Sequence, residues 1–106
     1  MAWLLLVLAG LFEIGMAVSL KASDGFSNLR ASVAFGVFAM LSFGLLATAL
    51  RDLPVGTAYA VWTGIGAAGT ALLGVALLGE SATPLRLGSI VLIVAGVVGL
   101  RLASPA

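Results

Sequence analysis

The hydrophobic residues of this chain form four long stretches, which three short polar segments separate. The first stretch contains a single charge, Glu13, the second and third contain none, and the fourth has Arg86 and Arg101 near its ends. A membrane-spanning helix needs about 20 mostly apolar residues, and an arginine at a helix end can reach the membrane surface. We therefore predict an all-α membrane protein with four transmembrane helices, over about residues 2–20, 31–50, 54–79 and 85–103.

The polar segments between these stretches are short. They read KASDGFSNLR (21–30), RDLP (51–54) and ESATPLR (80–86), and each contains a turn signal or a proline. Connections of this length force successive helices to run antiparallel, so both termini should lie on the same side of the membrane. The chain is then a single four-helix transmembrane domain over residues 1–106.

Composition supports lipid as the surrounding solvent. Hydrophobic residues make up 62% of the 106 residues and charged residues only 8%, whereas a soluble domain carries about 25% charged residues. The chain has no Cys and no His, which removes disulfides, thiol chemistry, histidine metal sites and the usual general base. We expect no metal, no cofactor, no nucleic-acid partner and no enzymatic activity.

The basic residues do not predict an orientation in the membrane. Lys21, Arg30 and Arg86 fall in the first and third segments, against Arg51 and Arg101 on the other side. The positive-inside rule depends on an excess of Lys and Arg on the cytoplasmic side, and here the excess is at most one. Either other cues set one orientation, or copies insert both ways round and form an antiparallel dimer.

Glu13 is the main candidate for function. At 1.5 Å per residue it lies about 16 Å along the first helix, near the middle of a hydrocarbon layer about 30 Å thick. An ionisable group at this depth by default marks a pathway or site. Its helical neighbours include Gly10 and Met16 and are mostly small, so open volume should lie beside the carboxyl. A low dielectric disfavours the charged form, so Glu13 could hold a proton and release it when a cation arrives. The alternative is a neutral acid that only joins helices.

Two aromatic residues on the third helix are candidates for recognising a cation. Tyr59 and Trp62 are three residues apart and share a helix face, and an aromatic face attracts cations when water is excluded. Both could instead belong to the aromatic belt at the membrane surface. Ser42, on the second helix, is a plausible partner that orients Glu13.

Small residues on the third and fourth helices predict close helix contacts. Residues 64–69 match the dinucleotide pattern G-x-G-x-x-G, but they lie within an apolar span with no preceding strand. We interpret Gly64, Gly66 and Gly69 as packing and kink positions, because glycines let another backbone approach or let a helix bend. The fourth helix has its own stripe, which we assign to contacts between subunits in preference to contacts within the fold: Gly88, Ala95, Gly96 and Gly99.

Four segments together resemble the small multidrug resistance (SMR) family of bacterial four-helix transporters, in particular its guanidinium-exporter-like (SugE-type) branch. These segments are AGLFEIGMAVSLKASDGF (9–26), LPVGTAYAVWTGIGAAGT (53–70), LLGESATPLR (77–86) and LIVAGVVGLRL (92–102). The likeness extends from Trp3 to about Leu102. The third-helix segment is long and specific, and it carries most of the resemblance together with Gly-Glu-Ser at residues 79–81.

The resemblance implies a dual-topology homodimer in the bacterial plasma membrane, or a heterodimer of paired homologues, that exchanges protons for a cation. Glu13 would be the shared proton and substrate site, and Ser42, Tyr59 and Trp62 would line the pocket. Gly10 would make room beside the carboxylate, and the glycines of the third helix would provide a kink. The guanidinium exporters usually have tryptophan where this chain has Met16, which supplies volume but no N–H donor.

The sequence therefore predicts a proton-coupled antiporter that exports small organic cations, most plausibly guanidinium or guanidinyl compounds. A broader range of quaternary ammonium cations is the alternative that Met16 leaves open, as is a role as one subunit of a paired transporter. An alternative from another class is a structural or regulatory membrane subunit in which Glu13 only fastens helices.

Overall fold

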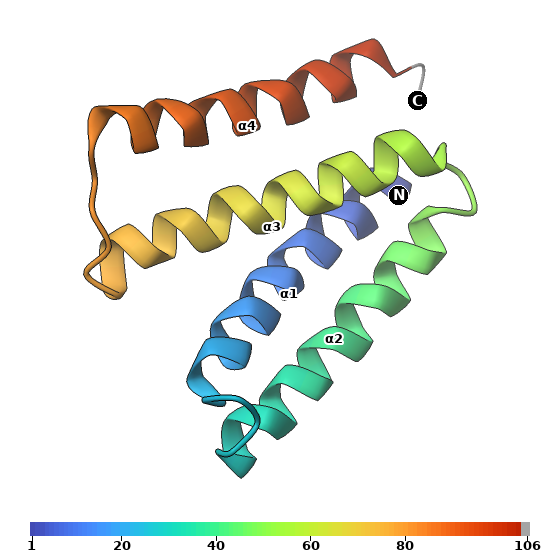
Figure 1. Ribbon diagram of the computed structural model, residues 1–106. Coiled ribbons are helices and arrows are strands. Elements are labelled where there is room, and N and C mark those ends of the chain that lie inside the picture. The colour runs from blue at the N-terminus through green and yellow to red at the C-terminus, as the bar shows by residue number, and fades with distance from the viewer. Residues whose placement is uncertain (105–106) are drawn as a thin grey trace.

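The computed structural model describes residues 1–104, and these residues form four α-helices and no strands (Figure 1). All four are long and apolar enough to cross a membrane, which confirms the prediction of an all-helical, four-span protein. The helix ends differ from the ranges expected from sequence by no more than two residues. The helices are α1 (Ala2–Ala22), α2 (Leu29–Ala49), α3 (Val55–Leu77) and α4 (Pro84–Ala103).

Local sequence explains where the helices begin. The Asn28 side chain accepts a hydrogen bond from the backbone N–H of Ala31 at 3.2 Å and caps α2. Thr83 caps α4 by accepting from the backbone N–H of Arg86 at 3.2 Å, and Pro84 occupies the first helical position. The first and third loops thus end in a side chain that caps the next helix, whereas α3 follows Pro54 without a side-chain cap.

The four helices form two hairpins that cross each other. In Figure 1, α1 and α2 run side by side, α3 crosses α1, and α4 lies along α3. Both termini lie at the end of the molecule that carries the α2–α3 loop. A buried core at this same end joins the first three helices and includes Leu6, Leu46, Val61 and Trp62.

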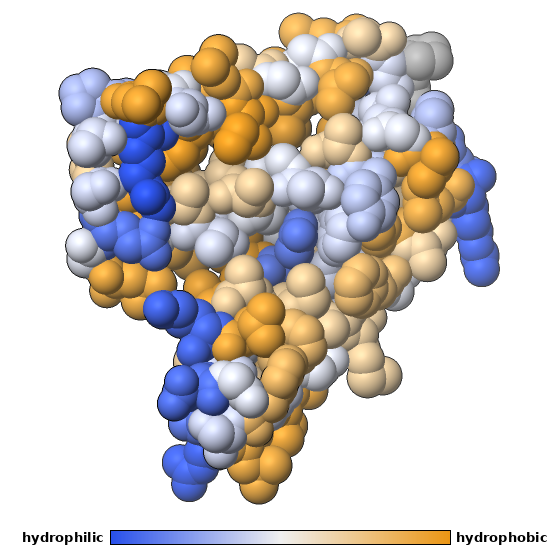
Figure 2. All heavy atoms as spheres, viewed as in Figure 1, coloured by the Kyte–Doolittle hydropathy of each residue, from blue (hydrophilic) through white to orange (hydrophobic). Residues whose placement is uncertain are grey.

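The outer surface of the helices is largely apolar. Figure 2 shows hydrophobic residues over most of the visible face, with hydrophilic residues at the helix ends and in a small spot among them. Large side chains such as Leu4, Met40 and Leu92 are exposed along the helices. Only 6% of the α4 span is buried, against 33% of the α3 span. These surfaces suit contact with lipid or with a second membrane subunit.

Candidate functional site

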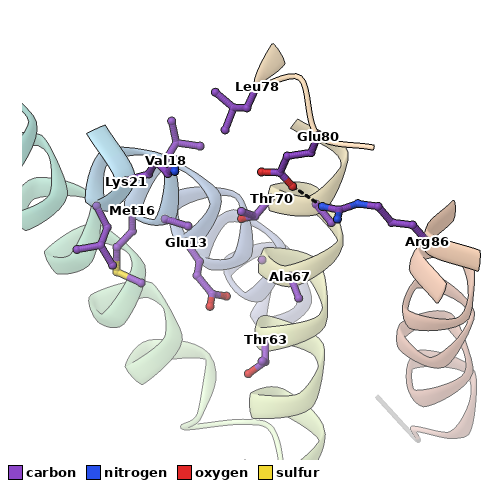
Figure 3. A pocket seen from close by; sticks show the side chains of 14 residues that line it. Glu13, Met16, Val18, Lys21, Thr63, Ala67, Thr70, Leu78, Glu80 and Arg86 are labelled. Carbon is purple, nitrogen blue, oxygen red and sulfur yellow. Dashed lines mark hydrogen bonds and ion pairs between the residues drawn. The ribbon is translucent and has the colours of Figure 1, made fainter. Parts of the chain in front are cut away.

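A cavity of about 510 Å³ lies between α1, α3 and the α3–α4 loop, and Glu13 lines it (Figure 3). α1 contributes one wall, α3 contributes the facing wall, and the loop closes one end. The lining residues are Glu13, Met16, Ala17, Val18, Leu20, Lys21, Thr63, Gly66, Ala67, Thr70, Ala71, Leu78, Glu80 and Arg86.

The Glu13 carboxyl lies beside the cavity and is partly withdrawn from solvent. It lies about midway along α1, and its Oε1 atom is buried without a hydrogen-bond partner among the described residues. A carboxyl oxygen that is withdrawn from water and left unpaired is costly. The cost falls when the oxygen binds a proton or a cation, and the adjoining cavity gives either ligand room.

Gly66 provides the space that the Glu13 side chain occupies. A Cβ atom built at residue 66 would collide with the carboxyl group of Glu13. The resemblance assigned this role to Gly10, but the space beside Gly10 is filled by Ile65, whose Cγ2 would lie 2.6 Å from a Cβ there. Gly10 is buried and does not line the cavity. In this structure the small neighbour of the carboxylate therefore comes from α3.

Ser42 contacts the backbone that carries Glu13 and makes no hydrogen bond with the carboxyl. Its hydroxyl donates to the carbonyl oxygen of Ala9 at 2.7 Å and accepts from Trp62 Nε1 at 2.9 Å. The carbonyl of residue 9 is also the one that accepts the backbone N–H of residue 13 in an α-helix. Ser42 therefore holds the turn of α1 that positions Glu13, and it ties α1, α2 and α3 together.

The two candidate cation-recognising aromatics lie together, away from the cavity wall. Trp62 is 4% exposed, and its ring lies 5.1 Å from that of Tyr59 and 5.4 Å from that of Phe43. Tyr59 is 52% exposed, so one face of this cluster is open. Neither Tyr59 nor Trp62 lines the cavity described above. The role that the resemblance gives them, in lining the substrate pocket, stays a prediction.

The predicted packing glycines have different surroundings on the two helices. On α3, Gly64 faces Val97, Gly66 faces Glu13 and Gly69 faces Ile14. α3 itself continues unbroken from Val55 to Leu77, so the kink stays a prediction. On α4, a Cβ would meet no atom within 4 Å at any of its glycines, and all four residues of its stripe are exposed: Gly88, Ala95, Gly96 and Gly99.

Sequence reasoning did not anticipate the charged end of the cavity. Lys21, Glu80 and Arg86 also line it, and Glu80 forms an ion pair with Arg86. One sequence signal could have indicated the cavity: Thr63, Thr70 and other small residues recur along one face of α3. This face extends from the level of Glu13 toward the loop. Within residues 1–104, no group of three Asp, Glu, His or Cys side chains could hold a metal ion.

Comparison with known proteins shows the family to which the chain belongs. Residues 1–93 match the family described as "Small Multidrug Resistance protein". A protein of Escherichia coli (strain K12) named "Guanidinium exporter" is 56% identical over 104 residues, which cover 98% of this chain and 99% of that protein. Proteins of the same name from Yersinia pseudotuberculosis and Salmonella typhimurium are 58% and 53% identical, over 98% of this chain and 100% and 99% of theirs. The chain is a multi-pass protein of the bacterial inner membrane and belongs to the Small Multidrug Resistance family.

Proposed function

We propose that this protein is a proton-coupled antiporter that exports guanidinium or small guanidinyl compounds. The observation that carries the proposal is Glu13 itself: it lies midway along a membrane-spanning helix, lines the cavity, and has one carboxyl oxygen that is buried without a hydrogen-bond partner. Full-length relatives that are 53–58% identical and named "Guanidinium exporter" supply the substrate class.

Coupling follows from competition for one group. A carboxyl in a low-dielectric site binds either a proton or an organic cation, because the neutral pair is favoured over a bare charge in both cases. A cation that arrives must displace the proton, and a proton that arrives must displace the cation. Protons are then the coupling ion, no other cofactor is needed, and the cation leaves chemically unchanged, so the protein is not an enzyme.

The working unit in this proposal is an antiparallel homodimer. The open, exposed small residues of α4, such as Gly96 and Gly99, provide a surface on which a second helix can approach closely. The nearly equal number of basic residues on the two sides permits insertion in both orientations. Each dimer would bring two Glu13 side chains to the transport pathway. A paired homologue in place of the second copy is the alternative.

A broader range of quaternary ammonium cations is the second candidate, and one observation favours it. Met16 lines the Glu13 cavity, and its flexible, polarizable thioether fits apolar groups of varied shape. Guanidinium differs from such cations because it is planar and carries N–H donors that pair with a carboxylate in a fork geometry. The two substrate classes can therefore be separated by direct comparison.

The test uses the purified full-length protein in liposomes that contain a pH-sensitive dye. Guanidinium and a tetraalkylammonium are added in turn across a range of pH, and proton efflux is measured. Wild type should couple guanidinium entry into the liposome to proton efflux, with weaker cation binding at lower pH because protons compete. Glu13→Gln should abolish the exchange, whereas Asp52→Asn, a matched change at an exposed loop carboxylate, should not.

Each result decides between the alternatives. If neither cation drives proton efflux, the antiporter is refuted. If only the tetraalkylammonium drives proton efflux, it replaces guanidinium as the substrate. Glu13→Gln protein that transports like wild type would show that Glu13 only fastens helices.

A further inference from the structure

The α3–α4 loop places a second carboxylate in the cavity that contains Glu13. Gly66, Thr70 and Gly74 are spaced four residues apart and form one ridge of α3. Gly66 and Thr70 line the cavity, and Gly74 faces Glu80 in the loop. A Cβ at Gly66 would collide with the carboxyl of Glu13, and a Cβ at Gly74 would lie 2.6 Å from the carboxyl of Glu80. These glycines are eight positions apart, which corresponds to about 12 Å along the helix. The two carboxylates thus stand at two levels of one cavity.

Local backbone geometry holds Glu80 in this position. α3 ends at Leu77, Gly79 has a φ of +69°, and the backbone N–H of Glu80 donates to the Gly74 carbonyl at 3.1 Å. The chain therefore turns back over the end of α3, a conformation that glycine adopts without strain. The carboxylate rests beside the negative end of the α3 dipole, which makes this place attractive to cations.

The cation that now occupies Glu80 is itself a guanidinium group. Arg86, in the first turn of α4, pairs through Nη2 with Oε1 of Glu80 (Figure 3). The pair uses one nitrogen and one oxygen, and Arg86 Nε is buried without a hydrogen-bond partner among the described residues. The side chains are 36% and 41% exposed for Arg86 and Glu80. A partly exposed, end-on pair of this kind is weak, and the positive N-terminal end of α4 also disfavours Arg86 there.

We propose that Glu80 is a capture site for the guanidinium-type substrate at the loop end of the Glu13 cavity, and that Arg86 is an intramolecular competitor which the substrate displaces. This inference rests on the proposed function. A free guanidinium ion can present two parallel N–H groups to the carboxylate, which is stronger than the end-on pair of Arg86. Thr70 lies between the two carboxylates and lines the path from Glu80 to Glu13.

The experiment measures KM and kcat for guanidinium-driven proton transport in liposomes. Removing the competitor with Arg86→Gln should lower KM, and removing the capture group with Glu80→Gln should raise it, each by about two- to fivefold as expected for a partly exposed pair. In both variants kcat should stay near that of wild type, because Glu13 is intact. Arg30→Gln is the matched control, since Arg30 is an exposed cation in the first turn of α2 that does not line the cavity.

The opposite signs of the two changes separate capture from a structural role. An ion pair that only fastens the loop is broken equally by either substitution, so KM would then move in the same direction in both variants, and that result would overturn the proposal. An unchanged KM in Glu80→Gln would overturn it as well. Where Arg86→Gln does not fold, Arg86→Lys should lower KM by a smaller factor, because lysine lacks the planar fork. Wild-type protein that moves no guanidinium would refute the proposed function instead.

Discussion

Three central glycines of α3 and the three glycines of α4 have the same chemistry and opposite surroundings. At Gly64, Gly66 and Gly69 a side chain of the same subunit already fills the space where a Cβ would stand. At Gly88, Gly96 and Gly99 no atom of the described chain lies within 4 Å of that point. The first group therefore lets α1 and α4 approach α3 within the subunit. The second group leaves an open face on α4, where a second helix could approach closely in the proposed dimer. This contrast leads to three predictions.

The largest effect is expected at Gly66. Gly66→Ala places a methyl group on the Glu13 carboxyl, and overpacking of this size costs about 1–3 kcal/mol, so guanidinium transport should fall by about tenfold or more. The measurement is the initial rate of proton efflux from liposomes. Gly36→Ala is the matched control, because a Cβ at residue 36 of α2 meets no atom within 4 Å. Equal rates for the two variants would show that Gly66 does not position Glu13.

Substitution of Gly96 should have a smaller effect, on formation of the proposed dimer. Gly96→Leu adds a bulky side chain to the open face of α4, which should weaken the proposed dimer by about 1–2 kcal/mol because the second helix can no longer approach closely. Chemical crosslinking in detergent measures the dimer, and circular dichroism checks that helix content is unchanged. A variant that dimerises as well as wild type would place the subunit contact on another surface.

The smallest effect is expected at Gly64. Gly64→Ala would put its Cβ 2.5 Å from Cγ2 of Val97, so the α3–α4 contact must open slightly, at a cost of about 1 kcal/mol. Thermal unfolding in detergent measures this cost. Combining the substitution with Val97→Ala should restore part of the stability, since it removes the opposing methyl groups. No recovery in the double variant would mean that α3 and α4 pack through other residues.

The sequence was informative where one physical rule acts alone. The helices could be placed within two residues because a hydrocarbon layer demands long apolar runs, which short polar segments separate here. The central depth of Glu13 followed from its position in the first run. Each of these conclusions needed only the order of residues along one helix.

Contacts between helices were harder to predict, because they depend on how the two hairpins cross. Gly10 and Gly66 are equally small, and only the crossing of α1 and α3 decides that Gly66 faces the Glu13 carboxyl. Ser42 was expected to orient Glu13; its hydroxyl bonds the Ala9 carbonyl and not the Glu13 carboxyl, so this role stays a prediction. The Glu80–Arg86 pair depends on how the chain folds back over the end of α3 after the turn at Gly79, which is a contact between segments and not a property of one helix.

The hydrogen bond between Trp62 and Ser42 gives the protein an intrinsic optical probe. Indole emission responds to the polarity and hydrogen bonding of its nitrogen, and Trp62 sits where α1, α2 and α3 meet. The chain has only one other tryptophan, Trp3, which lies at the N-terminal end of α1 with Arg101 over its ring. Trp3→Phe would leave Trp62 as the single tryptophan, so rearrangements of the three-helix junction during a transport cycle could be followed by selective excitation of its indole, in native lipid and without attaching a dye.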